Sequence, residues 1–173
     1  MSRVVGLAVC RRGEVASQRV DSLFLGPLGI EGDRHAGPTL VAGPRQKGVP
    51  RGTVLKNTRQ VSLVSVEESA AVATSLGIAS LDMTWLAANI ELTWPSLTKL
   101  ASGTRLRFSG GVVLALEGEN EPCRKVGKVV AAKTGLALES KFVKAAWGLR
   151  GVVGWVETPG RIIVGESVAL FPT

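Results

Sequence analysis

The sequence predicts a mainly β domain that also contains some α structure, built as a β-barrel decorated by a few helices. Glycine and proline are frequent, with 21 and 8 residues in a chain of 173, and this is typical of a turn-rich β protein. About ten short apolar segments have strand character and about three have helical character. Apolar residues make up 45 %, enough for a packed core, and the length fits one domain over residues 1–173.

The first 77 residues predict several strands and one capped helix. The expected strands are residues 4–9, 14–20, 23–25 and 60–64, the second pairing with the first across a turn at residues 11–13. Ser65 and Glu68 then match a capping box, in which each side chain bonds the backbone N–H of the other residue. The helix should run to about Leu76, with Gly77 as its C-terminal cap.

Two segments between these strands are expected to be loops. Residues 29–37 are mostly polar and contain glycines at short intervals. Residues 37–59 are rich in glycine, proline and basic side chains, and we expect a mobile basic loop there.

The remainder is expected to be mostly strand. A short helix should begin at Ser80 or Asp82 and reach Ala88, and residues 128–147 are helical in composition but interrupted at Gly135. Cys123 should lie in a loop. The expected strands are residues 90–92, 105–108, 112–117, 151–156, 161–164 and 167–171, with turns at 109–111 and 158–160 that make hairpins.

The net charge of +7 is unevenly distributed. Residues 1–60 and 99–150 each carry +6, whereas residues 61–98 carry −4. If the fold joins the two basic blocks, it creates a positive cleft that attracts a phosphorylated cofactor, a nucleic acid or an acidic partner. A basic surface that only keeps the protein soluble is the alternative.

Cysteine and histidine usage excludes several kinds of site. The two cysteines, Cys10 and Cys123, lie far apart, so they form neither a disulfide scaffold nor a CxxC metal site. His35 is the one histidine, so a metal would need most of its ligands from another molecule. No apolar run is long enough for a membrane span, and the N-terminus lacks the order of a secretory signal, so a cytoplasmic protein is expected.

Five segments in order resemble the MOSC domain, the module named after the C-terminal domain of molybdenum-cofactor sulfurases. They read GIEGDRHAG (29–37), RQVSLVSVEE (59–68), AANIEL (87–92), LASGTRLRFSGGVVLALEGENEPCRK (100–125) and GLRGVVGWVETPGRIIVGESVAL (148–170). The resemblance covers most of the chain from Gly29 onward. It implies a barrel of MOSC type, with Asp33 and His35 in the first segment, Asn89 in the third and Cys123 in the fourth as the family's motif residues.

Cys123 is the leading candidate for chemistry. The cations Arg124, Lys125 and Lys128 follow it, and cationic neighbours stabilise a thiolate and lower its pKa. A thiolate can hold a persulfide sulfur or ligate a soft metal such as molybdenum, and the resemblance implies one of these two roles. We expect Cys10, at the end of a strand, to be an inert buried residue.

Asp33 and His35 are the next candidates, and two interpretations of them stay open. They can orient a cofactor or move a proton, or Asp33 can cap a turn while His35 bonds a backbone carbonyl. Cofactor binding is predicted for Arg34, Arg59, Asn89, Arg124 and Lys125. For Asn89 a simple turn cap is the alternative, and for most of the cations it is solvated surface.

The resemblance implies binding of the molybdenum cofactor (molybdopterin), a small-molecule cofactor that brings its own metal and dithiolene sulfurs. The protein would then carry sulfur on Cys123 or reduce N-oxygenated compounds with molybdenum bound there. The chain shows no pyridoxal-phosphate, flavin or iron–sulfur motif, so a cysteine desulfurase or an electron-donor protein is the expected partner. The alternative function is a basic β-barrel module that binds nucleic acid, which scarce aromatic residues (5 %) make less favourable.

Overall fold

The computed structural model describes residues 2–172, and its strands are distributed along the whole chain. The longest are β1 (Ser2–Val9), β10 (Val113–Glu119) and β11 (Val152–Thr158). The other strands are β2 (Gln18–Arg19), β3 (Ser22–Gly26), β4 (Gly29–Ile30), β5 (Thr39–Val41), β6 (Val54–Lys56), β7 (Val61–Ser65), β8 (Ile90–Leu92), β9 (Arg105–Phe108), β12 (Gly160–Ile163) and β13 (Ser167–Leu170).

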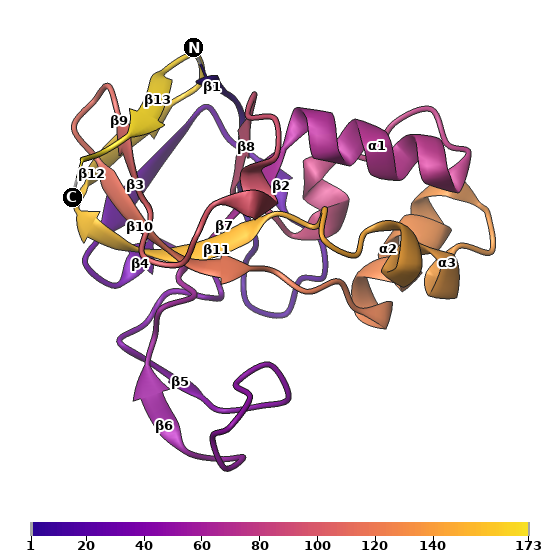
Figure 1. Cartoon of the computed structure of the whole chain (residues 1–173), viewed down its shortest axis with the longest axis horizontal. Coiled ribbons are helices and arrows are strands. Elements are labelled where there is room, and N and C mark those ends of the chain that lie inside the picture. Colours follow the sequence, from indigo (N-terminus) through magenta and orange to yellow (C-terminus); the bar gives the residue numbers. More distant parts are fainter. Residues whose placement is uncertain (1, 173) are drawn as a thin grey trace.

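The largest sheet closes on itself as a barrel (Figure 1). Its eight strands follow the order β13, β9, β10, β11, β7, β8, β1, β2, and an additional pairing of β13 with β1 closes the ring. All of these pairings are antiparallel except β7 with β8. Closure leaves no free edge between the first and last strands of the ring, which removes the usual site of strand addition. The barrel confirms the predicted fold class.

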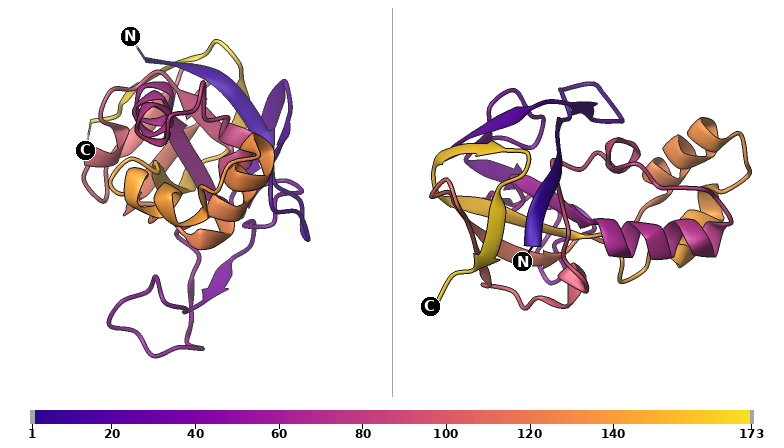
Figure 2. Two further views of the ribbon diagram at one scale, coloured as in Figure 1. Left: turned by 90° about the vertical axis from the view of Figure 1, so that its right-hand side faces the viewer. Right: turned by 90° about the horizontal axis from the view of Figure 1, so that it is seen from above.

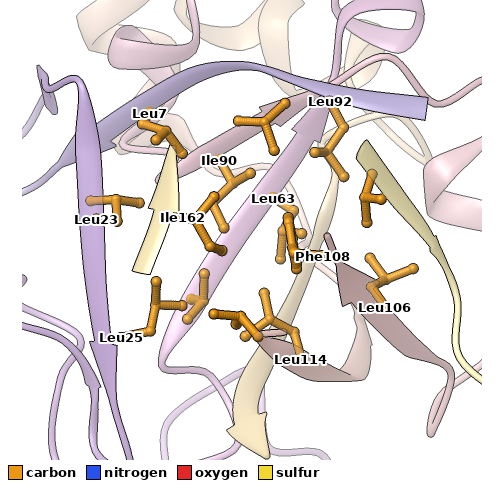
Figure 3. Close-up of a cluster of buried hydrophobic side chains, with 14 of the residues drawn as sticks. Leu7, Leu23, Leu25, Leu63, Ile90, Leu92, Leu106, Phe108, Leu114 and Ile162 are labelled. Carbon is orange, nitrogen blue, oxygen red and sulfur yellow. The ribbon is translucent and has the colours of Figure 1, made fainter. Parts of the chain in front are cut away.

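Apolar side chains fill the barrel interior (Figure 3). Inward positions alternate with exposed ones on short strands such as β9, where Leu106 and Phe108 are fully buried and Arg107 is exposed. Leu63, Leu114 and Ile162 reach the same cluster from β7, β10 and β12. This alternation is the period of two that the sequence displays in its strand segments.

The helices gather on one side of the barrel and enclose a second apolar cluster (Figure 2). They are α1 (Val66–Leu76), α2 (Arg124–Thr134) and α3 (Glu139–Ala145), with the 3₁₀ turn η1 (Met83–Leu86). A second 3₁₀ turn, η2 (Leu97–Lys99), instead contributes Leu97 to the barrel core. Phe142 of α3 and Val130 of α2 are fully buried in this cluster. Gly127 permits the close approach, because a Cβ on it would overlap the backbone carbonyl of Glu139.

The basic segment 37–59 contains structure that the sequence did not indicate. Its strands β5 and β6 pair as an antiparallel ribbon that projects from the barrel (Figure 1). The loop between them returns toward the molecule, where Lys47 Nζ lies 3.0 Å from Glu121 Oε1 and Arg45 Nη2 donates to the Glu121 carbonyl at 3.3 Å. The predicted mobility of this segment stays a prediction.

Two sequence expectations about pairing need correction. β12 does not form a hairpin with β11 but pairs with β3, in a separate three-stranded sheet with β4. The capping box is only half made: the Glu68 N–H donates to Ser65 Oγ at 3.2 Å, but Glu68 Oε1 accepts from the Thr98 hydroxyl at 2.6 Å instead of turning back. Both differences arise from partners distant in sequence.

Other boundaries agree closely with expectation. Helix α1 ends at Leu76 with Gly77 in the left-handed conformation (φ 68°), and Asp82 caps η1 by accepting the Thr84 N–H. Helix α2 begins earlier than predicted, at Arg124, and therefore starts directly after Cys123. No helix in the part of the chain that the structure describes is long and apolar enough to cross a membrane.

Candidate functional site

Cys123 is the last residue of the loop in which the sequence places it and at the same time the N-terminal cap residue of α2. The chain leaves β10, passes the buried Pro122 and reaches Cys123 in an extended conformation (φ −141°, ψ 158°). The first amides of a helix have no partner within the helix, and they point toward the cap residue. The thiol is half-buried, so it combines contact with these amides and access from outside.

The pKa of the Cys123 thiol lies below its ordinary value. Burial by itself raises it, but hydrogen bonding from the Val126 N–H, the nearby Arg45 guanidinium and the Lys125 N–H together outweigh burial. The basic neighbours predicted this direction, but the cause differs. Backbone amides of α2 and a cation from the distant basic segment stabilise the thiolate, while the Arg124 side chain is exposed.

The Asp33 carboxylate joins several elements in a buried network. Its Oδ1 accepts the His35 backbone N–H at 2.9 Å and lies 2.9 Å from His35 Nδ1. Its Oδ2 accepts the Cys10 backbone N–H at 2.8 Å and the Asn89 side-chain amide at 2.7 Å. Asn89 in turn accepts the Ser62 N–H at 3.0 Å. Asp33 is thus surrounded by donors that hold it in place.

This network fixes His35. Burial by itself raises the pKa of Asp33, but the hydrogen bonds from the His35 side chain, its backbone and Cys10 outweigh burial and lower it. An ionised Asp33 keeps the proton on Nδ1, which leaves Nε2 as an acceptor, and Arg34 Nε donates to it at 3.3 Å. The side chain of His35 is 38 % exposed and that of Asp33 is 0 % exposed, so His35 is the member that can meet a ligand.

A cavity of about 330 Å³ opens beside Cys123 and His35. Its walls come from the 29–37 loop, the basic segment, β7, η1, and the start of α2. None of its lining residues, all within residues 2–172, is an aspartate or a glutamate. The cationic lining residues are Arg34, Arg45, Arg59, Lys125 and Arg150. The fold therefore brings the two basic blocks together around one thiol, as the charge pattern allowed.

The structure separates the predicted cofactor-binding residues into two groups. Arg34, Arg59 and Lys125 line the cavity, and Arg59 is also paired with Glu117 at 2.5 Å. Arg124 is exposed and is not among the lining residues. The direct cofactor contact predicted for Asn89 needs correction, because its side chain is fully buried and bonded to Ser62, Ala8 and Asp33. Asn89 instead positions Asp33.

Sequence reasoning missed Arg150. It is 6 % exposed, its Nη2 donates to the Leu86 carbonyl, and its Nη1 is buried without a hydrogen-bond partner among residues 2–172. Burial lowers its pKa to about 10, so it remains charged at neutral pH. It stands alone between apolar residues in the sequence, outside any basic cluster. Its flanking Gly148 and Gly151, both at positive φ, are the local signal of a constrained turn.

Cys10 is placed as the sequence predicted. It is fully buried, burial raises the pKa of its thiol, and its Sγ lies 3.7 Å from the carbonyls of Glu14 and Ala16.

Cys123 should therefore react with iodoacetamide at neutral pH at least about 100-fold faster than Cys10, because it is more accessible and more often ionised. Mass spectrometry of the two cysteine peptides over time, from pH 6 to 9, measures both rates.

The dependence of the two alkylation rates on pH shows whether the pKa of each thiol is raised or lowered. A lowered pKa means that the Cys123 rate levels off at a lower pH than that of an ordinary thiol, while Cys10 stays slow throughout. Guanidinium-unfolded protein is the control, in which both cysteines should react alike. Equal rates in the folded protein, or faster labelling of Cys10, would contradict the assignment.

A family model for the MOSC domain matches residues 32–169. The chain belongs to the MOSC family. The matched span contains Asp33, His35, Asn89 and Cys123, so every motif residue that the resemblance singled out lies inside it.

Other proteins are similar to this MOSC protein in sequence, in fold or in both. YuaD of Bacillus subtilis (strain 168), which carries a provisional name as a metal-sulfur cluster biosynthesis protein, is 36 % identical over 170 residues, covering 96 % of this chain and 88 % of YuaD. The crystal structure of B. subtilis YuaD superposes with a TM-score of 0.91 at 37 % identity, over 97 % of this chain and 94 % of that one. YiiM from Geobacillus stearothermophilus shares the fold at a TM-score of 0.68 and 14 % identity, over 99 % and 76 % of the two chains.

Proposed function

We propose that this MOSC protein carries sulfur as a persulfide on Cys123. The observation that carries the proposal is the position of that thiol: half-buried at the start of α2, with a lowered pKa, facing a cavity lined by cations. A persulfide anion needs the same stabilisation as a thiolate, so this site suits both states. The provisional name of YuaD, which refers to metal-sulfur cluster biosynthesis, supports the same kind of role.

Loading is a thiol exchange that needs no oxidant. The Cys123 thiolate attacks the outer sulfur of a donor persulfide, R–S–SH. A new S–S bond forms on Cys123, the donor S–S bond breaks, and the donor leaves as the thiolate R–S⁻. The cavity cations stabilise the negative charge throughout, and His35 lines the same cavity. Because the chain shows no pyridoxal-phosphate motif, the proposed donor is a separate cysteine desulfurase.

The molybdenum cofactor is a second candidate, and the same residues favour it. Arg150 presents a buried donor without a partner among the described residues, which suits a phosphate, and Cys123 presents a soft thiolate ligand. These residues fit a group that has both an anionic end and a metal. When bound, the cofactor would supply oxygen exchange with N-oxygenated compounds, with electrons from a partner protein. Metal and pterin analysis of protein made in a cofactor-producing host tests this candidate.

The nucleic-acid alternative gains less support. The lining cations converge on a cavity that contains a thiol, and Arg150 is buried, whereas phosphate backbones are bound by exposed cations along a surface.

Incubation with a cysteine desulfurase and cysteine tests the sulfur-carrier proposal. After trapping with iodoacetamide, we expect the Cys123 peptide to gain the mass of one sulfur atom in most chains, while the Cys10 peptide stays unmodified. Desulfurase without cysteine is the control. A Cys123 peptide without added sulfur, or equal modification of both cysteines, would overturn the proposal.

A further inference from the structure

Arg150 is a buried cation with unused hydrogen-bonding capacity. One nitrogen, Nη2, donates to the Leu86 carbonyl, while Nη1 has no partner within residues 2–172. The described part of the chain offers it no carboxylate within ion-pair distance. A buried charge without a carboxylate partner is unfavourable, because an ion taken out of water loses its hydration. A bound anion would supply the missing charge and the missing hydrogen-bond acceptor.

The residues around Arg150 favour the binding of an anion. It lines the same cavity as Cys123, and the Cys123 thiolate and Arg150 interact electrostatically. Arg59 is already paired with Glu117, and Arg34 and Arg45 donate to backbone carbonyls. Among the described residues, Arg150 is thus the deeply buried cation of the cavity that has no carboxylate partner and no partner for Nη1. A planar guanidinium with a free N–H matches an oxoanion better than a point charge does.

We propose that Arg150 forms the oxoanion subsite for a small sulfur donor of the thiosulfate class, from which Cys123 takes its sulfur. This rests on the sulfur-carrier function proposed above and names a donor for it. The donor must carry a sulfane sulfur for the thiolate and an anionic end for Arg150, and inorganic thiosulfate has both. The cavity of about 330 Å³ accommodates a molecule of this size.

The transfer step balances without a further reactant. The Cys123 thiolate attacks the outer sulfur of S–SO₃²⁻, an S–S bond forms on Cys123, and the S–S bond of thiosulfate breaks. Sulfite, SO₃²⁻, leaves with the electron pair, and Cys123 is left as the persulfide anion. A thiolate and a dianion repel each other, so the reaction needs a cation that binds the oxygens before and during bond cleavage. Arg150 fills that role as a catalytic residue.

Binding is tested without the transfer step. Calorimetric titration of Cys123→Ser with sodium thiosulfate, against sodium chloride of matched ionic strength, should show one site. We expect at least about tenfold weaker binding when Arg150→Met is added, and several-fold weaker binding with Arg150→Lys, which keeps a charge but loses the planar fork. Arg12→Met, an exposed cation outside the cavity, is the matched control and should change nothing. Unchanged affinity in the Arg150→Lys variant would overturn the assignment even if Arg150→Met failed to fold.

Sulfite release in a single turnover tests the chemistry. Wild-type protein should release about one sulfite per chain and gain one sulfur on Cys123, and Arg150→Met should slow this at least about 100-fold. Wild-type protein should also load from a cysteine desulfurase, whose persulfide donor brings no oxoanion, and this loading is the reference for the sulfur-carrier function. If thiosulfate does not transfer sulfur to Cys123 while the desulfurase does, this inference is wrong and the sulfur-carrier function stands. If neither donor loads Cys123, the proposed function itself is wrong.

Discussion

Replacing Cys123 with serine is expected to abolish sulfur loading while the fold survives. A hydroxyl stores no sulfur as a persulfide and is a poor ligand for a soft metal, so sulfane sulfur per chain should fall to background. The side chain caps α2 and is half-buried, and serine is a preferred N-cap residue. The free energy of unfolding should therefore change by about 1 kcal/mol or less, a shift in Tm of roughly 2–4 °C.

Sulfane sulfur released by cyanide and thermal unfolding are measured on the same samples. Cys10→Ser is the matched control and should load normally, because Cys10 is fully buried away from the cavity lining. If the Cys123→Ser variant loads like the wild type, the sulfur resides elsewhere. If it unfolds outright, Cys123 is a structural residue and its assigned chemistry is wrong.

Local sequence features predicted most of the strands and one helix well. Strand boundaries at 90–92 and 105–108 agree with β8 and β9, because alternation of apolar residues and flanking turns is encoded within a few residues. Gly77 ends α1 as predicted for the same reason. The pairing of β12 with β3 was not predictable, since a strand next to a turn looks the same whichever partner it finds.

The candidate site was predictable only in part. Asp33, His35 and Cys123 were identified from their motifs. The cap position of Cys123 was missed because cysteine is not a typical capping residue. Arg150 was missed because its buried position is held by a contact with η1, distant in sequence, and nothing adjacent in the sequence marks a lone arginine as buried. Burial and pairing of charges are decided by tertiary structure.

Asp33 shows how one side chain links the stability of the barrel to the site. It accepts donors from Cys10 at the end of β1, from Asn89 before β8 and from His35 within its own loop. The motif residues Asp33 and Asn89 are bonded to each other and do not line the cavity, so they act on the site through His35. Asp33 is fully buried and contacts the imidazole, whereas His35 lines the cavity, and a role of His35 toward a ligand stays a prediction.

Asp33→Asn is expected to destabilise the protein by about 2–4 kcal/mol at pH 7, lowering Tm by roughly 5–15 °C. The asparagine amide has only one acceptor oxygen. Its NH₂ group, which is a donor, would therefore lie against either the Cys10 and Asn89 donors or the His35 donors, and those donors would lose their acceptor. Urea unfolding at pH 7 measures the difference. Asp21→Asn, at an exposed position, is the matched control and should change stability little.

The pH dependence distinguishes this network from a generic loss of packing. Hydrogen bonds lower the pKa of Asp33 below its ordinary value of 3.8, so its contribution is fully present above that value and is lost as pH falls through the folded-state pKa. The gap in stability between wild type and Asp33→Asn should therefore narrow as the pH is lowered below about 4, because the wild-type carboxyl becomes protonated and loses the same bonds. A gap that stays constant from pH 7 into this acid range would mean that Asp33 stabilises the fold by shape and not by its charge.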